Sequence, residues 1–187
     1  MMIDRAKFFK GWRQSFGKLT QEQVDGLESL IGNIEADIHV TDIRWAAYML
    51  ATVYHETGRT MQPIAEYSHG VGRPYGLPDP DTGKVYYGRG YVQLTWRANY
   101  EKMAKVFGVD FVHEPDLVMQ PGVAYQIMSY GMRKGAFTGR RLGQYMDDHN
   151  TDYTNARRII NGLDCADRIA RYAVRLEMIL LDARTAA

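Results

Sequence analysis

Residues 86–95 read Tyr-Tyr-Gly-Arg-Gly-Tyr-Val-Gln-Leu-Thr, and two glutamates, Glu56 and Glu66, precede them at short distance in the chain. Hydrolysis of a glycosidic bond commonly uses two carboxyl groups, one to protonate the leaving oxygen and one to activate water or attack the sugar. Aromatic rings and side-chain amides can hold the sugar rings beside these carboxyl groups. The segment and its two glutamates therefore predict a site that cleaves carbohydrate.

Length and composition are those of a globular protein with its own core. The 187 residues are 45% hydrophobic and carry a formal charge of +1, which favours a single domain over residues 1–187. This balance of charges favours neither a nucleic-acid-binding protein nor an acidic disordered chain. Cys165 is the one cysteine, so no internal disulfide and no thiolate zinc cluster can form.

Apolar periodicity predicts a mainly α-helical fold. Thr20 and Gln23 have the spacing of a capping box in front of one helix, and a second helix is expected to begin at Thr41 or Asp42. Residues 61–91 lose the periodicity and are rich in glycine and proline, which predicts a loop region with a small hairpin turning at residues 81–83. Further helices are expected over residues 96–107, 123–134, 154–160 and 166–183.

The two glutamates are expected in different electrostatic surroundings. Glu56 falls in the last turn of a helix predicted to end at Gly58, where the helix dipole and partial burial raise the pKa of a carboxyl group and favour a general acid. Glu66 falls on a glycine-rich loop, where a better-solvated carboxylate stays ionised and suits a base that activates water. The simpler alternative for each is a surface glutamate that only solvates the fold.

Motifs spread from about Trp45 to Leu180 resemble those of glycoside hydrolase family 19, which contains chitinases and phage endolysins. In chain order they are His55-Glu56-Thr57, residues 86–90, Gln93-Leu94-Thr95, Asn99-Tyr100, Ile159-Ile160-Asn161-Gly162 and Asp167-Arg168-Ile169. The resemblance implies a mainly α, lysozyme-like domain of two lobes, with a small β-hairpin and loop region beside the cleft. It also implies cleavage of β-1,4 bonds in N-acetylhexosamine polymers, with inversion of the anomeric centre.

The same resemblance assigns three catalytic roles. Glu56 is expected to be the general acid and Glu66 the general base, while the hydroxyl of Thr95 orients the attacking water. Inversion requires a gap of about 6.5 to 9.5 Å between the two carboxyl groups, which leaves room for that water. No cofactor is expected.

Seven further residues match supporting positions of the family. Three of them, Gln93, Asn99 and Asn161, match positions that bind N-acetyl sugars, and their side-chain amides can both donate to and accept from acetamido and hydroxyl groups. Tyr87 is expected to line the same cleft. Arg168 matches an arginine that pairs with the acid glutamate and with a second carboxylate, for which Asp164 is the nearest candidate. Arg89 is expected to support the loop.

These residues also have simpler structural interpretations. Tyr87 can be a packing aromatic, while Gln93 and Asn161 can hydrogen-bond loops or helix ends, as buried amides usually do. His55 and His69 lie near Glu56 in the sequence, but their spacing is not that of a zinc motif and no third ligand is evident. No metal site is therefore expected.

Three functions stay open at this point: a peptidoglycan glycosidase, a chitinase, and a non-catalytic sugar-binding relative. Plant chitinases of the family are exported and disulfide-bonded, whereas this chain has one cysteine and no apolar segment of signal-peptide type at its N-terminus. These features favour a phage endolysin that cleaves peptidoglycan and lyses the host cell. Retention of both glutamates and Thr95 argues against the non-catalytic alternative.

An endolysin of this kind is expected to accumulate in the cytoplasm of the host bacterium until a holin opens the inner membrane. The sequence contains no repeat module for wall binding and no apolar run long enough to span a bilayer. The basic residues of segment 168–184 stand among apolar residues at core-helix spacing, which favours packing over membrane contact. We expect a monomer.

Overall fold

The computed structural model describes residues 1–185, and most of its regular structure is helical. Its helices and strands are β1 Met2–Ile3, α1 Arg5–Phe16, α2 Gln21–Ala36, α3 Ile43–Glu56, β2 Ile64–Ala65, β3 Arg89–Gly90, α4 Arg97–Phe107, α5 Pro121–Lys134, α6 Ala166–Ala183 and β4 Arg184–Thr185. Short 3-10 helices, η1 Pro74–Gly76, η2 Pro115–Met119, η3 Leu142–Gln144 and η4 Asn155–Ile159, lie in the connections. None of the described helices is long and apolar enough to cross a membrane.

The predicted helix starts are confirmed where a side chain caps the helix. Thr20 accepts from the backbone N–H of Gln23 at 3.2 Å, and the Gln23 side chain accepts from the N–H of Thr20 at 2.9 Å, which completes the capping box of α2. Asp42 caps α3 by accepting from the N–H of Arg44 at 2.9 Å. Helix α3 then ends at Glu56, two residues before the predicted end at Gly58.

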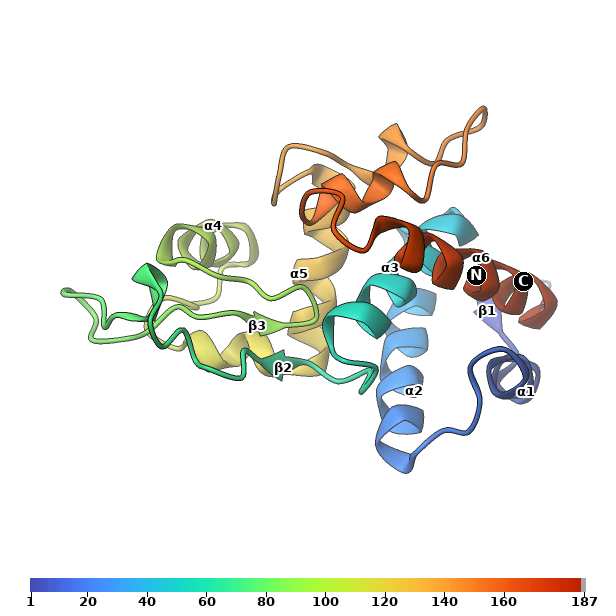
Figure 1. The fold of residues 1–187 in the computed structure, drawn as a ribbon, viewed down its shortest axis with the longest axis horizontal. Coiled ribbons are helices and arrows are strands. Elements are labelled where there is room, and N and C mark those ends of the chain that lie inside the picture. The colour runs from blue at the N-terminus through green and yellow to red at the C-terminus, as the bar shows by residue number, and fades with distance from the viewer. Residues whose placement is uncertain (186–187) are drawn as a thin grey trace.

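Two features near the N-terminus were not predicted from the sequence. Helix α1 buries Phe8, Phe9 and Trp12 and packs against α6, where Gly11 allows the side chain of Ile179 to come close. Strand β1 pairs with β4 in an antiparallel sheet, so the two ends of the chain lie together (Figure 1).

The helix predicted over residues 154–160 is a 3-10 helix, which is tighter than an α-helix. It is η4 and spans Asn155–Ile159.

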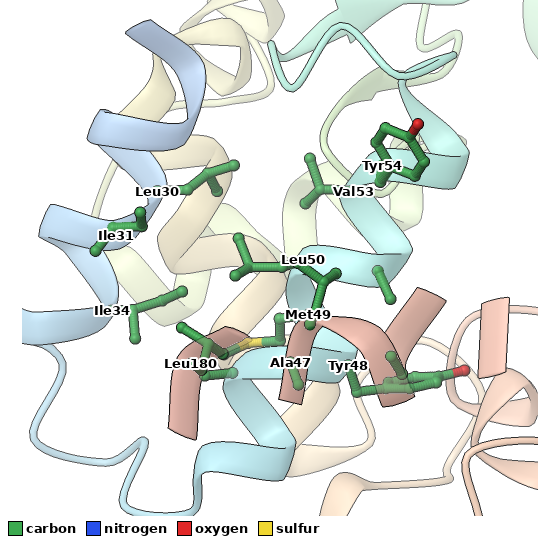
Figure 2. Packing of buried hydrophobic residues seen from close by; sticks show 14 of the residues in the cluster. Leu30, Ile31, Ile34, Ala47, Tyr48, Met49, Leu50, Val53, Tyr54 and Leu180 are labelled. Carbon is green, nitrogen blue, oxygen red and sulfur yellow. The ribbon is translucent and has the colours of Figure 1, made fainter. Parts of the chain in front are cut away.

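Helix α3 lies at the centre of the larger hydrophobic core. Every residue from 46 to 54 is buried. Figure 2 shows its apolar side chains beside Leu30 and Ile34 of α2 and Leu180 of α6. A helix that is apolar on all sides belongs inside a protein rather than at its surface. Because α3 is enclosed in this way, the position of its last residue, Glu56, is fixed by the core.

A second, smaller core lies around α4. It is formed by the buried residues Tyr86, Leu94, Tyr100, Met103, Phe111, Val118 and Ile127. Helix α5 serves both cores, because Tyr125 and Met128 belong to the larger one and Ile127 to the smaller one. The two cores are those of the two lobes, and the predicted mainly α, lysozyme-like fold is confirmed.

The β2–β3 hairpin belongs to the smaller lobe. Ile64 pairs with Gly90 and Ala65 with Arg89, and the long connection between them extends away from the helices at the left of Figure 1. At its tip, Asp79 and Lys84 are joined through their backbones, and Gly83 donates to the carbonyl of Asp79 at 2.8 Å. The turn predicted at residues 81–83 is confirmed, although the paired strands lie farther back, at the base of the loop.

Gly26 and Gly32 of α2 provide a matched test of this packing. A Cβ on Gly26 would lie 2.3 Å from the carbonyl oxygen of Met61, whereas a Cβ on Gly32 meets nothing within 4 Å. Gly26→Ala should lower the free energy of unfolding by about 1–3 kcal/mol, because the backbone at residue 61 has to shift. Gly32→Ala should raise it by up to about 1 kcal/mol, because alanine favours a helix. Urea unfolding measures both changes, and equal stability of the two variants would contradict this placement of α2.

Candidate active site

Glu56, the last residue of α3, is paired with a buried arginine. Its Oε1 accepts from Nη1 of Arg157 in η4. The side chain of Arg157 is 3% exposed and that of Glu56 is 17% exposed. Nε of Arg157 also donates to the carbonyl oxygen of Asp164 at 3.0 Å, which fixes the plane of the guanidinium group. The predicted place of Glu56 in the last helical turn is confirmed, and Arg157 is the one charge partner of its carboxylate within residues 1–185.

The prediction that Arg168 pairs with Glu56 was wrong. Arg168 is exposed in the first turn of α6 and forms no ion pair within residues 1–185, and the Asp164 side chain is exposed as well. Asp164 contributes its backbone carbonyl rather than its carboxylate. The reason is local: the 3-10 turn of η4 directs Arg157 inward and leaves Arg158 exposed. Two adjacent arginines in the sequence do not show which of them faces the core.

Two neutral groups complete the surroundings of Glu56. Burial lowers the pKa of His55 below its ordinary value, with the charges of Glu56 and Arg157 acting in opposite directions. Burial raises the pKa of Tyr48, and its hydroxyl has no hydrogen-bond partner among the described residues. Both groups are therefore uncharged near pH 7, and Arg157 is the cation bonded to this carboxylate.

Glu66 follows β2 directly, and its carboxylate accepts three hydrogen bonds. Ser68 Oγ and Tyr75 OH both donate to Oε1 at 3.1 Å, and the N–H of Gly88 donates to Oε2 at 3.3 Å. The backbone N–H of Glu66 donates to the carbonyl of Gly88 at 2.7 Å. The predicted loop position is confirmed, but the carboxylate is oriented by donors rather than freely solvated. Sequence reasoning missed Ser68 and Tyr75, which carry no motif of their own.

Gly88 brings three predicted site residues together. Besides its bond to Glu66, a Cβ at this position would lie 2.8 Å from Oε1 of Gln93 and 3.2 Å from Oγ1 of Thr95. The Thr95 hydroxyl donates to the carbonyl of Gln93 at 2.8 Å. The predicted base, the predicted water-orienting hydroxyl and one predicted amide therefore surround a single glycine that has no room for a side chain.

The amides of Gln93 and Asn99 are both bound through their nitrogens. Gln93 Nε2 donates to the carbonyls of Ile64 and Gly90 at 3.0 and 3.2 Å, which ties β2 to β3. Asn99 Nδ2 donates to the carbonyl of Thr95 at 2.7 Å. The structural interpretation of Gln93 is thus confirmed, and in both amides the oxygen is left as an acceptor with no bonded partner among residues 1–185.

Tyr87 is held by charged and aromatic neighbours. The guanidinium carbon of Arg89 lies 3.5 Å from the centre of its ring, and the imidazole of His69 stacks on it with ring centres 4.6 Å apart. Arg89 is buried, and it donates to Asp116 at 2.8 Å and to the Tyr100 hydroxyl at 3.1 Å. Arg89 therefore braces the loop, as expected, and fixes the ring of Tyr87, which stays half-buried.

Asn161 lies on the Glu56 side of the site. Its N–H donates to the carbonyl of Arg157 at 3.0 Å, and its exposed side chain accepts from the N–H of Gly162 at 2.9 Å. The predicted residues therefore form two groups, one around Glu56 and Arg157 and one around Glu66 and Gly88. No group of three or more His, Cys, Asp or Glu side chains suited to a metal occurs within the described residues.

Proteins of similar sequence include chitinases and a chitinase-like protein. An endochitinase of Arabidopsis thaliana is 37% identical over 89 residues, which are 44% of this chain and 30% of that protein. An inactive chitinase-like protein of Hevea brasiliensis is 50% identical over 36 residues, which are 19% of this chain and 12% of that protein. The matches thus span less than a third of these relatives.

Similarity of structure extends over nearly the whole chain. The crystal structure of chitinase C from Streptomyces griseus superposes with a TM-score of 0.65 at 24% identity, covering 99% of this chain and 79% of that one. This likeness concerns the fold. The family model described as chitinase class I matches residues 36–132, a range that contains α3, both glutamates and the whole β2–β3 hairpin. Since this range is more than half of the sequence, the chain belongs to the chitinase class I family, glycoside hydrolase family 19.

Proposed function

We propose that this chain hydrolyses β-1,4 glycosidic bonds of an N-acetylhexosamine polymer by an inverting acid/base mechanism. The observation that carries the proposal is the contrast between its two candidate carboxylates. Glu56 is paired with buried Arg157 at the end of a rigid helix, whereas Glu66 accepts three hydrogen bonds from uncharged donors. Two carboxyl groups in different surroundings can take the two different proton-transfer roles that this reaction needs.

In the proposed reaction, Glu56 gives its proton to the glycosidic oxygen as the bond from that oxygen to C1 breaks. A water molecule attacks C1 from the opposite face of the sugar, and Glu66 accepts the proton that the water loses. Thr95, whose hydroxyl lies beside Gly88 with Glu66, orients this water. Arg157 holds the carboxyl group of Glu56 in place throughout the reaction.

The amide groups favour N-acetylated sugars. Because the nitrogens of Gln93 and Asn99 are bound to backbone carbonyls, these side chains offer acceptor oxygens to a ligand. An acetamido group has an N–H to donate to such an acceptor, and sugar hydroxyls can donate as well. Tyr87, fixed by Arg89 and His69, offers an aromatic ring beside them.

Peptidoglycan is the polymer that we favour, and chitin is the second candidate. The single cysteine excludes the internal disulfides of the exported plant enzymes, which fits an endolysin held in a host cytoplasm until a holin releases it. The names of the relatives favour chitin, because the matched proteins from Arabidopsis thaliana and Streptomyces griseus are chitinases. The chemistry proposed for the two carboxylates is the same for both polymers.

Glu56→Gln should reduce the release of fragments from purified peptidoglycan more than a hundredfold, because the amide keeps the shape of the side chain but cannot deliver a proton. Mass spectrometry after borohydride reduction measures the fragments, with chitin assayed in parallel. A reduced muramic acid end identifies a muramidase, and a reduced glucosamine end a glucosaminidase. Near wild-type release by a Glu56→Gln protein with an unchanged melting temperature would eliminate Glu56 as the acid. If the wild-type protein cleaves chitin and not peptidoglycan, chitin replaces peptidoglycan as the proposed substrate.

Arg157→Met and Arg168→Met form a matched pair that separates the two arginines. Arg157→Met should reduce kcat at least tenfold, because Glu56 loses the arginine that is bonded to it, and Arg168→Met should reduce it less than threefold. Arg157→Lys should recover part of the lost activity, because lysine restores the positive charge. Recovery should be incomplete, because lysine lacks the planar guanidinium group that bonds both Glu56 and the carbonyl of Asp164. Initial rates are compared for variants whose thermal unfolding shows that they are folded. A larger loss in Arg168→Met than in Arg157→Met would contradict the role given to Arg157.

A further inference from the structure

A cavity lies away from the two glutamates, between the C-terminal ends of α2 and α4 and one side of α5. We name it the α5 pocket. Its volume is about 530 Å³, and its lining includes Asp37, His39, Phe107, Gln126, Tyr130 and Arg133. None of the predicted catalytic or sugar-binding residues lines it. The volume falls within the range of sites that bind small molecules, about 300–1,000 Å³.

One wall of the α5 pocket is a fixed polar network. Asp37 accepts from Ser129 Oγ at 2.5 Å, from Tyr125 OH at 3.1 Å and from the N–H of His39 at 3.0 Å. Arg133 Nε donates to Ser129 Oγ at 3.1 Å. Burial acts to raise the pKa of Asp37, but the bonds from Ser129 and His39 and the charge of Arg133 hold it below its ordinary value. The wall therefore carries one carboxylate and one guanidinium, whose charges cancel.

Other residues of the lining are apolar. The rings of Phe107 and Tyr130 meet edge to face with centres 5.7 Å apart, and both side chains are half-buried. Two further residues of the lining are aliphatic and exposed: Ile38 is 82% exposed and Val106 is 38% exposed. Aromatic and aliphatic side chains thus line part of the pocket, and the aliphatic ones are exposed.

Two amide side chains line the same pocket. Gln126 is exposed on α5, and its side chain has no hydrogen-bond partner within residues 1–185. Asn33 donates through Nδ2 to the carbonyl of Ser29 at 2.7 Å, which leaves its oxygen as an acceptor. The two side chains add one complete amide and one amide oxygen to the network of Asp37 and Arg133.

These features select a class of ligand. A lone phosphate or a lone cation is not favoured, because the fixed charges of Asp37 and Arg133 compensate each other. The ligand is expected to be neutral overall, rich in hydroxyl or amide groups on one side and apolar on the other. A sugar ring has this character, since its C–H face packs on aromatic rings while its substituents hydrogen-bond to amides and charged groups.

We propose that the α5 pocket is a second glycan-binding site, which binds N-acetylated sugar units separately from the site of Glu56 and Glu66. The amide of Gln126 and the oxygen of Asn33 match the donor and acceptor of an acetamido group. If the proposed function holds, the pocket keeps an insoluble polymer attached while the other site cuts it. Attachment through two sites raises the effective concentration of the bound strand.

Amide NMR of the full chain, titrated with tri-N-acetylchitotriose, tests this proposal. We expect shifts at residues 37–39, 106–107 and 126–133 that follow a single binding curve. Gln126→Trp fills the pocket and should weaken this binding at least tenfold, and Ile38→Glu, which adds a charge at a highly exposed position, should weaken it as well. Gln14→Trp is the control, because it makes the same change at an exposed glutamine of α1 outside the pocket, and its binding should stay within twofold of wild type.

The absence of shifts in these segments, or unchanged binding in both pocket variants, would overturn the proposal. Equally strong binding of cellotriose, which lacks acetamido groups, would overturn the assignment to N-acetylated sugars. Amide dispersion shows whether each variant is folded, and the proton spectrum of the probe shows that it stays intact. If the wild-type protein shows these shifts but hydrolyses neither peptidoglycan nor chitin, the proposed function fails and the second glycan-binding site stands. Failure of the proposed function and failure of the second site can therefore be distinguished.

Discussion

The enclosure of α3 on every side is the constraint on which the rest of the structure depends. Its residues 46–54 are all buried, and each large apolar side chain among them contributes about 1.5–3 kcal/mol through burial. Helix α6 packs along α3, and η4 contacts α6 just before that helix begins. The ion pair between Glu56 and Arg157 is therefore formed between two segments that the same core holds in place.

The other half of the site depends on close approach of backbones rather than on a core helix. Gly88 lies against Gln93 and Thr95 and donates to Glu66, so a short segment positions three side chains at once. The buried guanidinium of Arg89 supports this segment from within the smaller lobe. One carboxylate is thus fixed by a helix end and an arginine, and the other by a loop that depends on a glycine.

Local signals in the sequence predicted most of the fold and part of the candidate site. The capping box at Thr20 and the cap at Asp42 predicted where α2 and α3 begin, because these interactions span only a few residues. The partner of Glu56 could not be predicted in the same way, because it depends on how η4 turns about a hundred positions farther along the chain. The donors Ser68 and Tyr75, and the α5 pocket, likewise depend on segments that only the fold brings together.

In the proposed reaction, Glu56 and Glu66 act as an acid and a base through water, with no covalent intermediate. Proton NMR of the first product released from a β-linked N-acetylglucosamine oligosaccharide or glycan strand, recorded before mutarotation, tests it most directly. We expect the α-anomer to appear first, because water attacks the face opposite the leaving group. Initial appearance of the β-anomer would mean retention of configuration. That result would require a nucleophile close to Glu56 or participation by the acetamido group of the substrate, and it would contradict the role given to Glu66.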